Sequence, residues 1–195
     1  MIQFTEMVAR LKAWQVFILL VFPMFAGQFY LMGLMPVPGT ATQPPSIEDL
    51  NAVIEQTMLM TFLFMVLLLG WLLSVAFAAN RRVDQSIRLD TRFAVGFAIY
   101  ATGYIALAQF IFPKPGATPS EGLSIGLIIP LHVLAMFGIF YVLAFAARNI
   151  IMAERQSPVT FFDYSGPLFL MWFFPIGVWF VQPRVNRLVA DDAGE

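Results

Sequence analysis

The feature that most constrains this chain is a set of four long apolar runs that contain no Asp, Glu, Lys or Arg. Their cores are Trp14–Met35, Thr57–Ala79, Phe93–Phe112 and Leu123–Ala147. Each run reaches the roughly 20 residues that an α-helix needs to cross the hydrocarbon core of a bilayer. The sequence therefore predicts an all-α integral membrane protein, a bundle of four transmembrane helices with a further short hydrophobic element near the C-terminus.

Composition agrees with lipid as the main solvent. Of the 195 residues, 59% are hydrophobic and 12% are charged, whereas soluble domains average about 45–50% and about 25%. The net charge of −1 gives no electrostatic reason to expect nucleic acid as a partner. The absence of cysteine excludes disulfides, thiolate metal ligands and cysteine nucleophiles.

The chain divides into three parts. Residues 1–13 form an amphipathic N-terminal segment, residues 14–188 form a single transmembrane helical domain, and residues 189–195 form an acidic C-terminal tail. The first apolar run is longer than the stretch of about 7–15 apolar residues in a signal peptide. We therefore expect it to remain in the protein as the first span.

Local signals predict where three helices begin. Ser46 with Asp49 is typical of an N-cap with an acidic first turn, so the second long helix should begin before its apolar run. Thr118 with Glu121 fits a capping box for the fourth long helix. A short helix at the membrane interface should follow Thr160.

The fifth apolar run, Gly166 to Val181, is short, rich in aromatic residues and interrupted by Pro175 and Gly177. It can be a re-entrant hairpin packed against protein or a short, kinked fifth span. Basic residues precede the first span, fill the second connection and follow the fourth span, which predicts a cytoplasmic N-terminus. A fifth crossing would put Arg184 and Arg187 outside, so the charge pattern favours re-entry.

Small residues recur at four-residue spacing on two of the runs. They are Gly70, Ser74 and Ala78 on the second, and Ala94, Ala98, Thr102 and Ala106 on the third. Helices in lipid associate by close contact of such residues. We expect these two rows to be helix-packing surfaces within the bundle.

His132 is the only histidine and lies inside the fourth run. It is a candidate axial ligand for haem or chlorophyll, or a proton carrier. The alternative is a neutral imidazole hydrogen-bonded to a neighbouring helix. One histidine cannot supply the three or four protein ligands of a zinc site, so no metal site is predicted, and no cofactor can be named.

A second group of candidate residues lies in the C-terminal part. We expect it to contact lipid headgroups or a partner protein, local salt bridges and capping being the alternative. Its members are Glu154, Asp163, Tyr164, Trp172, Pro175, Gly177, Trp179 and Arg184.

Within this region the segment Trp172–Asn186, WFFPIGVWFVQPRVN, is distinctive. Over about residues 148–188 the chain resembles uncharacterised bacterial multi-pass membrane proteins. The resemblance implies a location in the bacterial inner (cytoplasmic) membrane, and it carries over no catalytic residue.

These observations favour a non-enzymatic accessory or scaffolding subunit of a membrane complex, associating with other membrane proteins or with itself. The first alternative is a small transporter or channel for a neutral or lipid-like solute, with Gln28, Gln109 and His132 lining an oligomeric pathway. The second is a membrane enzyme that uses Glu154, Asp163 and Tyr164 at the headgroup level.

Overall fold

The computed structural model describes residues 2–34, 46–111 and 125–190, which are helical apart from short connections and contain no strand. The all-α prediction is therefore confirmed for these residues. The helices are α1 (Ile2–Ala9), α2 (Ala13–Leu34), α3 (Ile47–Asn80), α4 (Arg92–Ile111), α5 (Ile125–Arg155), α6 (Phe161–Trp172) and α7 (Phe174–Ala190).

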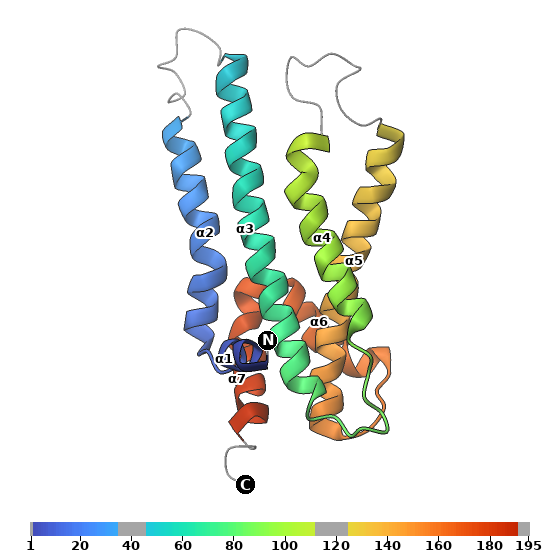
Figure 1. Cartoon of the computed structure of the whole chain (residues 1–195). Helices are drawn as coiled ribbons and strands as arrows, with labels where there is room; N and C mark the ends of the chain where they lie inside the picture. The colour runs from blue at the N-terminus through green and yellow to red at the C-terminus, as the bar shows by residue number, and fades with distance from the viewer. Residues whose placement is uncertain (1, 35–45, 112–124, 191–195) are drawn as a thin grey trace.

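Helices α2 to α5 run side by side, and the three shorter helices α1, α6 and α7 gather near the end of the molecule where both termini lie (Figure 1). We call this end the lower end. Helix α3 is central, because it contacts α1, α2, α4, α5 and α7. Within the described residues α2 contacts neither α4 nor α5. The four long helices thus form a group of three, α3 to α5, with α2 against one side, rather than a closed four-helix ring.

Two helices, α3 and α5, are long and apolar enough by length and composition to cross a membrane. Helix α3 has 34 residues, a length of about 50 Å at ~1.5 Å per residue. Helices α2 and α4 qualify only as shorter apolar helices, over Ala13–Phe29 and Arg92–Ala108.

Local caps begin two helices where the sequence predicts. The Ser46 hydroxyl accepts the Asp49 backbone N–H at 3.1 Å, and the Asp49 carboxylate accepts the Ser46 backbone N–H at 2.9 Å. At α6, the Asp163 carboxylate accepts both the backbone N–H and the hydroxyl of Thr160. The predicted start at Thr118 and Glu121 lies outside the described residues.

The packed core occupies the lower half of the molecule. All buried residues of α3 lie between Met65 and Asn80. Above this level α3 and α4 flank a cleft of about 210 Å³ lined by Met58, Phe62 and Ala106, among others. The helices therefore pack closely near the lower end and diverge towards the other end.

Candidate functional site

The broken fifth apolar run folds into a helical hairpin made of α6 and α7. Phe173 alone separates the two helices, with φ −90° and ψ 54°, and its N–H donates to the Phe169 carbonyl at 2.9 Å. In the next turn Gly177 lies so close to Leu170 that an added Cβ would be 1.6 Å from the Leu170 carbonyl oxygen. Gly177 is thus the residue that lets α7 fold back on α6.

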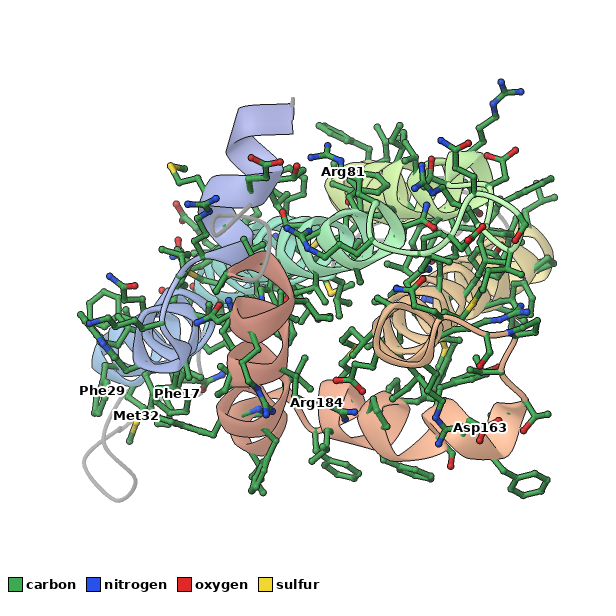
Figure 2. All side chains as sticks on the ribbon, turned by 90° about the horizontal axis from the view of Figure 1, so that it is seen from below. Phe17, Phe29, Met32, Arg81, Asp163 and Arg184 are labelled. Atoms are coloured by element: carbon green, nitrogen blue, oxygen red, sulfur yellow. The ribbon has the colours of Figure 1, made fainter. Side chains whose placement is uncertain are left out.

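Two ion pairs fasten the hairpin to the last turn of α5. Asp163 near the start of α6 pairs with Arg155, and Arg184 in α7 binds Glu154 through two nitrogens, one of them Nε at 2.8 Å. Seen from below, the labelled Asp163 and Arg184 lie on α6 and α7 beside the end of α5 (Figure 2). Both limbs of the hairpin therefore reach the same end of the molecule.

These contacts lower the pKa of one carboxylate. Hydrogen bonds from the Thr160 hydroxyl and backbone N–H, together with Arg155, lower the pKa of Asp163 to about 2. Asp163 is therefore ionised at neutral pH and holds no proton to donate. The predicted cluster of Glu154, Asp163 and Tyr164 is divided, since each carboxylate has its own arginine and the Tyr164 ring packs 5.5 Å from that of Phe161.

A buried amide that the sequence analysis missed connects α7 to the N-terminal part. The side chain of Gln182 is fully buried; its Oε1 accepts Trp71 Nε1–H at 2.9 Å. Its Nε2 donates to the carbonyls of Ala9 at 2.9 Å and Leu11 at 2.8 Å. Glutamine is rarely fully buried. Apart from the proline that follows Gln182, no neighbouring residue indicates that this side chain is buried.

With its polar groups engaged in this way, the hairpin presents an aromatic and aliphatic outer surface, which we call the hairpin face. Trp172 stacks on Phe140 of α5, with ring centroids 4.3 Å apart, and Trp179 packs against Phe17 of α2 at 5.6 Å. The exposed residues of the hairpin face are Phe161, Phe162, Phe169, Trp172, Phe173, Ile176, Trp179 and Phe180. Pro175, in the first turn of α7, is also exposed.

The small-residue rows face the interior of the lower half only. Ser74, Ala78, Ala94 and Ala98 are buried. Thr102 and Ala106 are half-buried, and a Cβ on Gly70 would meet nothing within 4 Å. The close helix approaches occur elsewhere, at Gly27 against Met60 and at Gly138 against Phe97.

Of the polar residues proposed for a pathway, Gln28 and His132 lie on different helices of the described part, α2 and α5. His132 is exposed on α5, with Nδ1 3.3 Å from the Tyr104 hydroxyl on α4. Gln28 is exposed beside a cleft between α2 and α3, and the side chain of Gln109 lies outside the description. His132 thus has a partner on a neighbouring helix, as the alternative interpretation expects, and its role as a cofactor ligand stays a prediction.

No group of three or more His, Asp or Glu side chains with metal-binding geometry occurs in the described part of the chain. The resemblance of the C-terminal segment to bacterial membrane proteins also stays a prediction. No known protein family, curated protein or solved structure matches the chain.

Proposed function

We propose that this protein is a membrane-embedded accessory subunit, which uses the hairpin face to hold a partner protein at the cytoplasmic side of the bilayer. In this arrangement α2, α3, α4 and α5 span the membrane. Helix α1 and the α6–α7 hairpin stay on the cytoplasmic side, the hairpin dipping into the interface.

The apolar outer surface of the long helices supports the membrane location. Phe29 and Met32 of α2 are 71% and 72% exposed, and Figure 2 shows their side chains at the outer edge of the molecule. Helix α5 carries a similar row that includes Leu127, Val133 and Phe137. Exposed apolar patches of this extent are rare on soluble proteins and typical of surfaces that contact lipid or another protein.

The charges support the orientation. Every Lys and Arg among the described residues lies at the lower ends of the helices or in the connections there, whereas Glu48, Asp49 and Glu55 lie at the opposite end of α3 (Figure 1). The positive-inside bias assigns the lower end to the cytoplasm.

The hairpin face is the observation that carries the accessory role. Two ion pairs and the Gln182 hydrogen bonds attach the hairpin to the rest of the molecule, yet eight of its large apolar side chains remain exposed. A preorganised aromatic surface of this kind loses little conformational entropy on binding, and buried aromatic residues dominate the energetics of protein interfaces.

Topology is tested with single cysteines, because the chain has none of its own. We expect Ser46→Cys to react with a membrane-impermeant maleimide in intact cells, and Ser86→Cys and Ala190→Cys to react only after lysis. Labelling of Ala190→Cys from outside would refute the re-entrant arrangement. Release of the protein by alkaline carbonate would refute the membrane location.

The accessory role is tested by native electrophoresis of the solubilised protein. We expect one stable band that contains a second protein in fixed ratio, and its loss in the variant Phe162→Ala/Phe169→Ala/Phe180→Ala. The matched control is Phe22→Ala/Phe29→Ala, which removes exposed rings from α2. A band of the protein alone, or equal effects of both variants, would refute the role.

A further inference from the structure

A pocket outside the hairpin face opens near the lower ends of α4, α5 and α6. Its volume is about 350 Å³, within the ~300–1,000 Å³ of small-molecule sites. Its lining includes Asp90, Phe93, Tyr141, Phe145, Arg148 and Tyr164. One cation, one anion and four aromatic rings therefore surround one space.

Arg148 is the unusual member of this lining. It is half-buried, its Nε is buried without a hydrogen-bond partner, and no ion pair engages it among the described residues. The neighbouring Arg155 and Arg184 both have carboxylate partners. A buried donor left unpaired costs free energy, so an acceptor brought by a ligand would stabilise Arg148 in this position.

Aromatic rings form part of the pocket wall. The centroid of the Tyr141 ring lies 5.1 Å from that of the Phe97 ring and 6.3 Å from that of the Phe145 ring, and this packing fixes the orientation of Tyr141. Phe93, at the start of α4, is 66% exposed and connects the pocket with the outer surface of that helix. A ligand with a polar head and an apolar tail matches this combination.

The two charged residues, Arg148 and Asp90, indicate the chemistry of the ligand's polar headgroup. Guanidinium is the preferred side chain for phosphate, because its planar array of donors matches the phosphate oxygens. Asp90 Oδ1 accepts the Arg92 backbone N–H at 2.8 Å, while Oδ2 accepts no hydrogen bond from a described residue. The formal charges of Arg148 and Asp90 cancel, which suits a zwitterion better than a purely anionic group.

We propose that this pocket binds the zwitterionic headgroup of a phospholipid that carries a primary ammonium. Its phosphate contacts Arg148, its ammonium contacts Asp90 Oδ2, and its acyl chains follow the outer surface of α4. The pocket rests on the membrane location proposed above, since only a bilayer presents such a headgroup at this level.

The test is native mass spectrometry of the detergent-solubilised protein with phosphatidylethanolamine, phosphatidylglycerol or phosphatidylcholine added at equal concentrations. We expect the ethanolamine lipid to bind most tightly and Arg148→Gln to weaken it by about tenfold or more, as for loss of a charge-assisted hydrogen bond. Arg187→Gln, an exposed arginine outside the pocket, is the matched control and should bind as the wild type does.

Asp90→Asn keeps the proposal falsifiable if the Arg148 variant fails to fold. We expect it to lose the preference for the ethanolamine lipid over the glycerol lipid and to retain the glycerol lipid. Equal binding of all three lipids by the wild type, or wild-type binding by Arg148→Gln, would overturn the proposal. Complete displacement by an equal concentration of free phosphoethanolamine would also overturn it, because the ligand would then be a soluble phosphate ester.

Failure of the lipid proposal can be distinguished from failure of the proposed function. If carbonate extracts the protein, the membrane location and the pocket both fall. If cysteine labelling gives the expected topology and no lipid preference is found, only the pocket is refuted.

Discussion

At the scale of single residues, one amide joins three distant parts of the chain. Gln182 on α7 binds the indole of Trp71 on α3 and two backbone carbonyls, one at the end of α1 and one in the turn that follows. Since both its amide oxygen and its amide nitrogen are engaged inside the core, no apolar residue of similar size can replace it without leaving polar groups unpaired.

We therefore predict that Gln182→Leu lowers the free energy of unfolding by about 2 kcal/mol, the typical cost of leaving buried donors and acceptors unpaired. Denaturant unfolding in detergent micelles, followed by tryptophan fluorescence, measures it. Gln85→Leu, at an exposed position, is the control and should change the value by less than ~0.5 kcal/mol. Similar losses in the two variants would show that the Gln182 contacts contribute nothing specific.

Gly177 gives a second residue-scale prediction. Gly177→Ala places a methyl group against the Leu170 carbonyl, so the hairpin must open, and we expect a loss of at least about 2 kcal/mol, as at overpacked sites. Gly166→Ala is the matched control, because a Cβ there meets nothing within 4 Å. It should stabilise α6 by up to about 1 kcal/mol. Equal midpoints in thermal melts would contradict the tight turn.

At the scale of elements, we predict that the attachment of α6 depends on pH. The pKa of Asp163 falls from 3.8 to about 2 in the folded protein. Because the folded value is the lower one, the stabilisation is complete above about pH 4 and is lost as the pH falls from about 4 to 2. Between these values we expect the melting temperature of the wild type to fall more steeply than that of Asp163→Asn.

Thr160→Val serves as the intermediate case in the same titration. The Thr160 hydroxyl makes the largest contribution to the lowered pKa, so its loss should reduce the pH dependence without abolishing it. Parallel curves for the wild type and Asp163→Asn would show that this carboxylate does not hold the hairpin.

The sequence predicted those features of the elements that depend on neighbouring residues. The cap at Ser46 and the helix start after Thr160 are predictable because each uses a partner three residues away. The contacts of Gln182 with Trp71 and Ala9 are not, because these partners lie 111 and 173 residues away. The small-residue rows show the same limit, since spacing alone does not distinguish Gly70, which has open space beside it, from Gly27, which abuts Met60.

At the scale of the whole molecule, the tightly packed lower half contrasts with the open cleft between α3 and α4. Ala98 is 4% exposed in the core, whereas Ala106, two turns further along α4, lines the cleft. We predict that Ala98→Leu costs about 1–3 kcal/mol through overpacking and that Ala106→Leu changes stability by less than ~0.5 kcal/mol. Thermal melts of the two variants in the same detergent provide the comparison, and equal costs would mean that the cleft is closed in solution.

The hydrogen bonds between α7 and the turn after α1 also determine the order in which the protein can be completed. A ribosome delivers Ala9 and Leu11 first and Gln182 after all four long helices have emerged. These hydrogen bonds can therefore form only after α7 has been synthesised.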